Sequence, residues 1–252
     1  MHEERSLYSH MRVVDYGRMR ALYFGESQTH LVETLVDRDR PQRLQHGYAH
    51  AMAAAFLYRP DASSALLVGL GGGALVHFIN HDFPQVRLDV VEIDPAMVKL
   101  TKDWFGTGEG PRTRILVADG AEFLRRSGGR YDVILLDAHL DGGELTDPSG
   151  HPLSMKTAEF YDALRARLQP GGVVMFNMLA GAEGEAYRAG IRSAFPSVQA
   201  FRSANGGNLV VAAKADGKLA GKDELAARAR VLDRRGDLGF SFSEVVGRAE
   251  LH

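Results

Sequence analysis

From residue 64 onward, short apolar stretches alternate with segments whose apolar positions recur every three or four residues. This alternation predicts strands and helices in turn, as in a mostly parallel sheet with helices on both faces. Strands are expected at 65–68, 87–92, 114–118, 131–137 and 173–177, and helices at 74–83, 95–105, 121–126 and 155–168. The nearly continuous apolar character of the fourth strand is typical of a strand that is covered on both faces.

The N-terminal sixty residues follow a different pattern. Residues 11–16 and 19–24 flank a turn that contains Gly17, and they predict a β-hairpin. Residues 31–36 are a candidate third strand, and residues 48–58 predict a helix. We therefore expect a small β-rich appendage with one helix, at 1–60, before the main sheet.

The C-terminal part predicts an edge to the sheet. Residues 200–202 and 208–212 flank an Asn-Gly-Gly turn, which favours an antiparallel hairpin. A charged helix is expected at 222–234. We divide the remaining chain into a doubly wound, Rossmann-like α/β core at 61–214 and a C-terminal helix and tail at 215–252.

The composition narrows the functional classes. The chain has 252 residues, of which 45% are hydrophobic and 25% charged, as in an ordinary globular protein. Its net charge of −2 provides no general attraction to nucleic acid or to an anionic membrane, so neither is an expected partner. Because it contains no cysteine, disulfides, thiolate metal sites and cysteine nucleophiles are excluded, and a cytoplasmic location is expected. No apolar run approaches the ~18 residues of a membrane span.

A glycine-rich turn is the first candidate binding element. Gly69, Gly71, Gly72 and Gly73 lie between the first core strand and the next helix, where a nucleotide binds in sheets of this kind. Glu92 ends the following strand, and its carboxylate can accept hydrogen bonds from both hydroxyls of a ribose. Tight packing of the turn is the structural alternative, and the same glycines also fit a relaxed dinucleotide-binding pattern.

Two further acidic residues follow strands on the same side of the predicted sheet. Asp119, next to Gly120, can accept the exocyclic amine of adenine, and it can also cap the helix that follows. Asp137 ends the fourth strand beside the same crevice. His139 lies in the long polar loop 138–153 and is a candidate contact for an acceptor substrate. A dehydrogenase, which the dinucleotide-binding pattern of the glycines would allow, is a poorer match to the motifs that follow the glycine turn.

The chain at this point resembles the polyamine aminopropyltransferases, the spermidine synthase family. The segments that carry the resemblance are Val68-Gly-Leu-Gly-Gly-Gly73, Val90-Val-Glu-Ile-Asp-Pro95, Val117-Ala-Asp-Gly120, Tyr131-Asp-Val-Ile-Leu-Leu-Asp137 and Glu159-Phe-Tyr161 through Pro170-Gly-Gly172. The resemblance implies a Rossmann-like methyltransferase sheet and a homodimer. It also implies decarboxylated S-adenosylmethionine as the donor and a diamine as the acceptor. In this family the residues matching Glu92 and Asp119 bind the nucleoside, and the residue matching Asp137 accepts a proton.

The chain departs from the family pattern at positions that contact the amine groups of the two substrates. The family has an aspartate that contacts the aminopropyl amine, and Gly72 stands in its place. The second aspartate of the family's Asp-Ser-Ser-Asp segment is replaced by Leu140 or displaced to Asp141. The glutamate of the family's Tyr-His-Glu segment is replaced by His50, whereas the tyrosine of that segment is retained as Tyr48. We take Tyr48, His50, His139 and Asp141 as the candidate substrate-binding residues.

The predicted function is transfer of an aminopropyl or other alkyl group from an adenosyl sulfonium donor to a small-molecule amine, with Asp137 as the catalytic residue. The donor is either decarboxylated or intact S-adenosylmethionine, because loss of an acid at Gly72 removes a charge that repels the carboxylate of the intact form. No metal is expected. Two alternatives stay open, namely a methyltransferase that uses S-adenosylmethionine and a non-catalytic nucleoside-binding homologue.

Overall fold

A seven-stranded sheet forms the centre of the computed structural model, which describes residues 1–25, 32–140 and 144–250. The strands are β5 (Ser64–Val68), β6 (Arg87–Glu92), β7 (Thr113–Val117), β8 (Tyr131–Leu136), β9 (Leu168–Leu179), β10 (Ser197–Arg202) and β11 (Asn208–Lys214). Their spatial order is β10-β11-β9-β8-β5-β6-β7. The chain runs outward from β5 in one direction and from β8 in the other, so a crevice opens between the ends of these two parallel strands. The α/β fold class is confirmed.

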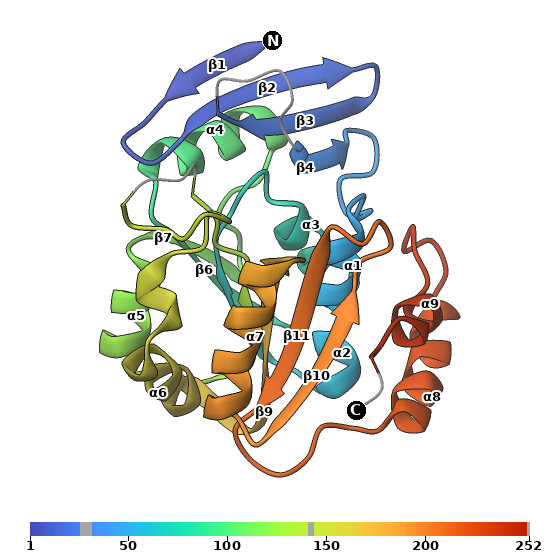
Figure 1. Cartoon of the computed structure of the whole chain (residues 1–252). Coiled ribbons are helices and arrows are strands. Elements are labelled where there is room, and N and C mark those ends of the chain that lie inside the picture. The colour runs from blue at the N-terminus through green and yellow to red at the C-terminus, as the bar shows by residue number, and fades with distance from the viewer. Residues whose placement is uncertain (26–31, 141–143, 251–252) are drawn as a thin grey trace.

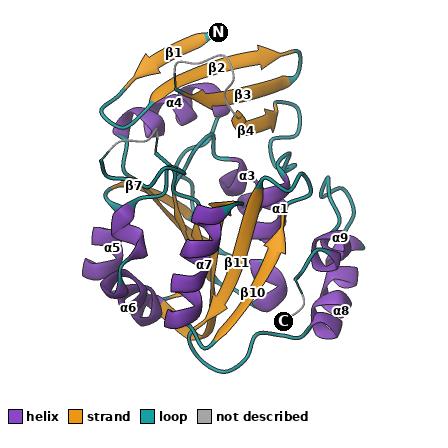
Figure 2. Ribbon diagram, in the orientation of Figure 1, coloured by secondary structure: helices purple, strands orange, loops and turns teal. Residues whose placement is uncertain are grey.

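Helices cover both faces of this sheet (Figure 2). One face carries α1 (Gly47–Ala53), α2 (Ala55–Tyr58), α3 (Ala74–Asp82), α8 (Lys222–Asp233) and α9 (Phe242–Gly247), and the other carries α5 (Gly120–Arg126), α6 (Ala158–Arg167) and α7 (Ala182–Ala194). Alternate side chains of β5 enter the two cores: Ala65 and Leu67 join the first, Leu66 and Val68 the second. Every residue of β8 is buried, which explains its continuous apolar sequence.

The N-terminal residues form a separate antiparallel sheet, which lies at the top of Figure 1. Its strands, in spatial order, are β1 (His2–Arg5), β2 (His10–Tyr16), β3 (Met19–Phe24) and β4 (Val32–Asp37). It packs on α4 (Pro95–Phe105) through a small core of Met11, Val13, Leu22, Val36, Met97, Leu100 and Phe105. The predicted hairpin around Gly17 is confirmed. Thr34 of β4 accepts a hydrogen bond from the backbone N–H of Gly72, which lies in the turn after β5, so this sheet lies over the crevice.

Some elements differ from the sequence prediction. The helix expected at 48–58 is divided between α1 and α2 at Ala54. The helix expected at 155–168 becomes a 3₁₀ turn, η1 (Leu153–Lys156), followed by α6, because Thr157 accepts a hydrogen bond from the backbone N–H of Phe160 at 3.2 Å and starts a new helix.

The sequence pattern does not indicate β1, α7 or α9. In α7 the buried positions are Gly184, Tyr187, Arg188 and Ile191, so only two large apolar or aromatic side chains define its inner face. The C-terminal hairpin of β10 and β11 is confirmed, and β11 runs antiparallel to β9. No helix within the described residues has both the length and the apolar character needed to cross a membrane.

Candidate active site

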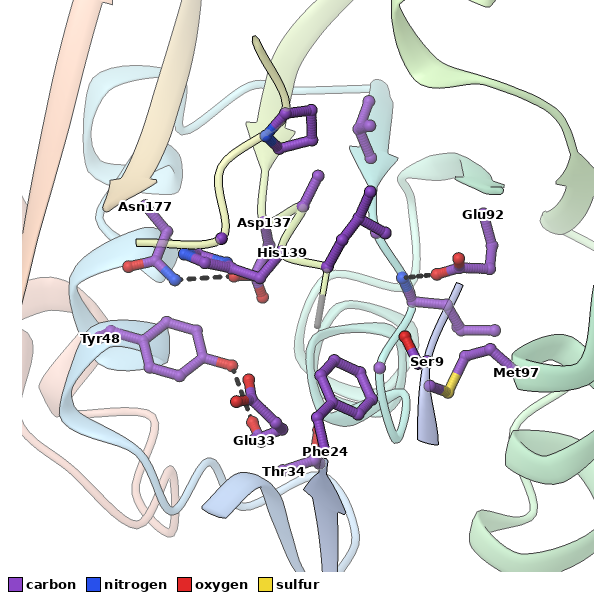
Figure 3. A pocket seen from close by; sticks show the side chains of 18 of the residues that line it. Ser9, Phe24, Glu33, Thr34, Tyr48, Glu92, Met97, Asp137, His139 and Asn177 are labelled. Atoms are coloured by element: carbon purple, nitrogen blue, oxygen red, sulfur yellow. Dashed lines mark hydrogen bonds between the residues drawn. The ribbon is translucent and has the colours of Figure 1, made fainter. Parts of the chain in front are cut away.

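A cavity of about 950 Å³ lies where β5, β6, β8 and β9 end beneath the N-terminal sheet. Figure 3 shows part of its lining, with side chains that enter from β4, α1 and the central strands. The described lining residues include six acidic side chains and neither lysine nor arginine; the six are Glu33, Glu92, Asp94, Asp119, Asp137 and Glu144. The cavity therefore suits a ligand with positive charge.

The glycine turn brings the ends of β5 and β8 into contact. Gly69 has a φ of +96°, and a Cβ built on it would lie 2.2 Å from the backbone oxygen of Asp137. No other residue type fits this close approach, since a side chain would force the two strand ends apart. The backbone at Gly69 and Gly71 is therefore exposed to the cavity, as the sequence predicts for a nucleotide-binding turn.

Glu92 braces this turn and also faces the cavity. Its Oε2 accepts a hydrogen bond from the backbone N–H of Leu70 and its Oε1 accepts one from that of Asp94, both at 2.9 Å. Burial raises the pKa of Glu92, and these two hydrogen bonds oppose the shift. A carboxylate has about four acceptor positions, so Glu92 can still accept a ribose hydroxyl besides these backbone groups.

Asp119 caps a helix and also lines the cavity. Its Oδ1 accepts a hydrogen bond from the backbone N–H of Glu122 at 2.8 Å and so caps α5. Both Asp119 and Gly120 line the cavity. A Cβ at Gly120 would lie 2.4 Å from the Cγ1 of Val68, so the glycine permits close packing of α5 on β5.

Asp137 lies just beyond β8, and the amide of Asn177 is hydrogen-bonded to its carboxyl group (Figure 3). The Nδ2 of Asn177 donates to its Oδ1 at 2.8 Å, and Asn177 accepts in turn from the Nδ2 of Asn208 at 3.1 Å. The hydroxyl of Tyr48 lies close enough to interact with the carboxyl group of Asp137 as a second hydrogen-bond donor. Burial raises the pKa of Asp137 to about 6, although both hydrogen bonds act in the opposite direction. A carboxylate of this kind accepts a proton more readily than an ordinary aspartate.

Tyr48 lies between two acidic side chains. Its hydroxyl donates to the backbone oxygen of Glu33 at 3.4 Å, a long hydrogen bond that leaves its single proton able to turn towards Asp137. Burial raises the pKa of Tyr48 well above its usual value, and the charges of Asp137 and Glu33 add to the effect. The phenol therefore stays protonated.

His139 borders the cavity from the loop after β8. Its Nε2 is buried and has no hydrogen-bond partner in the described part of the chain. Burial lowers the pKa of His139 to about 3, and the ring of His151, 4.2 Å away between centroids, adds to this shift. His139 is thus a neutral imidazole at the border of the cavity, with a buried nitrogen that accepts no hydrogen bond from the described residues.

The loop that follows is folded against the site. The Nε2 of His151 lies 3.1 Å from the backbone oxygen of Asn177, and its Nδ1 lies 2.7 Å from the Oγ of Ser149. Asp147 accepts the backbone N–H of His151 at 3.0 Å and forms an ion pair with Lys156. These contacts hold the described residues of the loop beside the cavity, which several of them line.

Three of the predicted site residues do not face the cavity, and a fourth cannot be placed. The ring of His50 stacks on Phe240 with centroids 4.4 Å apart, and its Nε2 lies 2.9 Å from the backbone oxygen of Leu44, so His50 is directed away from the cavity in this structure. The remaining residue, Asp141, lies outside the described residues.

Gly72 and Gly73 are also absent from the lining. The N–H of Gly72 donates to the Oγ1 of Thr34 at 3.0 Å, and a Cβ there would meet the Cγ2 of Thr34 at 2.7 Å. Gly73 adopts a φ of +76° and begins α3, against the side chain of Thr107. These two glycines therefore shape the turn and do not contact the cavity.

The site contains residues that the sequence did not single out. Glu33, His46, Asn177 and Asn208 all line the cavity. Asn177 is a buried polar residue near the carboxyl end of the apolar strand β9, and this position was a usable signal. The approach of Glu33 and Asn208 depends on how distant strands are arranged. The described residues include no group of three or more His, Cys, Asp or Glu side chains placed to hold a metal ion.

Comparison with known proteins adds a family match. Residues 48–180 match the model of the spermine/spermidine synthase domain. The polyamine aminopropyltransferase of Chromobacterium violaceum is 28% identical over 241 residues, which cover 94% of this chain and 88% of that protein. That of Vibrio vulnificus is 29% identical over 181 residues, which cover 70% of this chain and 58% of that protein, less than two thirds of its length.

Methyltransferases are similar as well. The eEF1A lysine and N-terminal methyltransferase of Homo sapiens is 30% identical over 169 residues, covering 60% of this chain and 24% of that protein. The structure of human methyltransferase-like protein 13 in complex with SAH has a TM-score of 0.62 and 26% identity, covering 80% of this chain and 94% of that one. A spermidine synthase in complex with the transition-state analogue AdoDATO has a TM-score of 0.73 at 19% identity, covering 98% and 83%. The last likeness shows the fold alone.

Proposed function

This chain belongs to the spermine/spermidine synthase family, and from that premise we propose that it transfers an aminopropyl group from decarboxylated S-adenosylmethionine to a small-molecule amine. The observation that carries the proposal is the position of Asp137. Its buried carboxyl group faces the same cavity as Glu92 and Asp119, so a proton acceptor lies opposite two groups suited to a nucleoside.

For this reaction the protein mainly has to align the donor carbon with the acceptor nitrogen. The acceptor nitrogen forms a bond to the carbon next to the sulfonium, and the carbon–sulfur bond breaks with its electron pair staying on sulfur as a neutral thioether. The nitrogen loses a proton to the carboxylate of Asp137, which passes it to solvent. Orientation of the reactants and this proton transfer are the two contributions that the cavity can make.

Further residues have proposed roles around this centre. Glu92 accepts the ribose hydroxyls and Asp119 the adenine amine, with Gly69, Gly71 and Gly120 letting the nucleoside approach the backbone. Tyr48 orients Asp137. His139 contacts the acceptor through its unpaired Nε2, and because burial keeps its pKa at about 3, its neutral ring does not repel an incoming ammonium group.

A methyltransferase is the second candidate. It is supported by the 30% identity to the human eEF1A lysine and N-terminal methyltransferase and by the absence of an acidic side chain at Gly72. Against it, the described lining provides no lysine or arginine to receive the carboxylate of intact S-adenosylmethionine. We favour the decarboxylated donor for this reason. The raised pKa of Asp137 favours an enzyme over a non-catalytic nucleoside-binding protein, because only an enzyme uses a proton acceptor.

The test is a product assay with two donors. The protein is incubated with either decarboxylated or intact S-adenosylmethionine and a panel of primary mono- and diamines, and the released thioether is identified by mass spectrometry. We expect amine-dependent release of methylthioadenosine, lost in Asp137→Asn. Amine-dependent release of S-adenosylhomocysteine, without methylthioadenosine, would overturn the proposal in favour of methyl transfer. Release of neither product would leave the non-catalytic alternative.

A further inference from the structure

A β-bulge turns one acidic residue of the N-terminal sheet into the cavity. In the pairing of β3 with β4, Leu22 lies opposite Thr34 and Tyr23 lies opposite Val32. Glu33 is therefore the extra residue that β4 carries relative to β3. Bulges of this kind bend a strand and redirect a side chain, and they are frequent beside active sites. Here the bulge lets the consecutive residues Glu33 and Thr34 both line the cavity.

Thr34 covers Gly72, the position at which the family has an aspartate. Its Oγ1 accepts the N–H of Gly72, and its Cγ2 would lie 2.7 Å from a Cβ at that residue, with the Cε1 of Phe105 at 3.0 Å. No side chain at position 72 can enter the cavity without displacing both neighbours. Any carboxylate on this side of the cavity has to come from another element.

Glu33 is such a carboxylate. It lies beside the hydroxyl of Tyr48 in Figure 3, and the charges of Glu33 and Asp137 both act on that hydroxyl. The hydroxyl of Tyr48 thus lies within the electrostatic reach of two carboxylates that line the same cavity. A primary ammonium group has three N–H donors and needs acceptors of this kind when it leaves water.

We propose that Glu33, together with Asp137 and Tyr48, binds the terminal ammonium group of the donor's alkyl arm. This inference rests on the proposed aminopropyl transfer and names the residue that selects the donor. A donor arm that ends in an ammonium group alone gains two charge-assisted hydrogen bonds. An arm that also carries a carboxylate brings that negative charge next to Glu33, which repels it.

The experiment compares ligands that differ only in the arm. Calorimetry with wild type and Glu33→Gln measures the dissociation constants of decarboxylated S-adenosylmethionine, intact S-adenosylmethionine and methylthioadenosine, which lacks the arm. We expect Glu33→Gln to weaken the decarboxylated donor by about 10-fold or more, the usual effect of losing a charged partner. Methylthioadenosine should change by less than about 2-fold, and the preference for the decarboxylated over the intact donor should fall.

Two controls separate the possible causes. Glu144→Gln removes another carboxylate of the cavity lining, on the loop and exposed, and should leave the ratio of the dissociation constants unchanged. Glu33→Asp keeps the charge and should keep part of the preference. If Glu33→Gln and Glu33→Asp weaken methylthioadenosine as much as the decarboxylated donor, Glu33 serves the fold and the inference is wrong.

The inference and the proposed function fail in different ways. Wild type that binds and turns over the decarboxylated donor, with an unchanged ratio in Glu33→Gln, overturns the role of Glu33 and leaves the function intact. Wild type that does not bind the decarboxylated donor overturns both.

Discussion

The carboxyl group of Asp137 is tied to the amide of Asn177, whose Nδ2 donates to Oδ1 at 2.8 Å. The two residues follow or belong to neighbouring parallel strands, β8 and β9. Asn208, on the antiparallel strand β11, fixes the orientation of the amide by donating to its Oδ1 at 3.1 Å. The group proposed to accept the proton is therefore positioned by three strands of one sheet.

Replacing Asp137 by Asn should separate binding from chemistry. The amide keeps the size of the side chain and can still accept from Asn177, but it cannot take up a proton. We expect turnover to fall about 10²-fold or more, the scale of a lost general base. Calorimetry should give wild-type affinity for methylthioadenosine. Wild-type turnover in this variant would remove Asp137 from the mechanism.

The same carboxyl group sets a pH dependence. With its pKa raised to about 6, Asp137 takes up a proton as the pH falls through that value and can no longer accept one from the substrate. The rate of transfer should therefore decrease about tenfold per unit below this pH. Initial rates with donor and acceptor both well below saturation, which report the ligand-free enzyme, test the expectation across this pH range. A profile whose acidic limb lies near the ordinary pKa of aspartate would contradict it.

Asp137→Asn should also make the protein more stable at neutral pH. The folded-state pKa of about 6 lies above the ordinary value of 3.8, so the buried charge destabilises the fold increasingly as the pH rises between these values. Above that range we expect the variant to gain about 1–3 kcal/mol in unfolding free energy. Urea unfolding at a pH near 8 and again near 4 measures it. The two proteins should converge at the lower pH; a less stable variant near pH 8 would be evidence against a buried charge.

Much of the fold follows from the sequence because its signals are local. The continuous apolar run of β8 and the glycine turn each act within a few residues. Glu92, Asp119 and Asp137 could be placed together since each follows or ends a parallel strand, and such ends meet at one edge of the sheet.

The remaining parts of the site depend on the orientation of side chains and on contacts between segments that are distant in the sequence. The helix position of His50 gives no indication that its ring faces Phe240. The sequence of the turn does not reveal that Thr34 covers Gly72. Glu33 enters the cavity through a bulge whose existence depends on the register of two strands. None of these features has a short-range signature.

Replacing Glu92 should lower both the affinity for the nucleoside and the stability of the fold. In Glu92→Gln the amide nitrogen cannot accept a hydrogen bond, so one of the backbone N–H groups of Leu70 and Asp94 loses its partner, and one ribose contact weakens. We expect methylthioadenosine to bind about 1.5–3 kcal/mol more weakly. Calorimetry together with urea unfolding measures the two effects. An unchanged dissociation constant would show that Glu92 does not contact the nucleoside.

Gly69→Ala should disrupt the contact between β5 and β8. The new Cβ would lie 2.2 Å from the backbone oxygen of Asp137, at a φ of +96° that alanine rarely adopts. We expect a loss of more than about 2 kcal/mol in unfolding free energy. Gly108→Ala is the matched control, because nothing lies within 4 Å of its Cβ and its φ is ordinary. Equal stabilities of the two variants would contradict the close approach.

The most direct test of the central claim is the relative affinity of wild type for the two donors. An acidic cavity without a lysine or arginine in its described lining should bind the donor whose arm ends in an ammonium group and disfavour the one that adds a carboxylate. Calorimetry at one pH and ionic strength gives both dissociation constants. We predict that decarboxylated S-adenosylmethionine binds at least about tenfold more tightly, the effect of one charge-assisted hydrogen bond. Equal or tighter binding of intact S-adenosylmethionine would contradict the account.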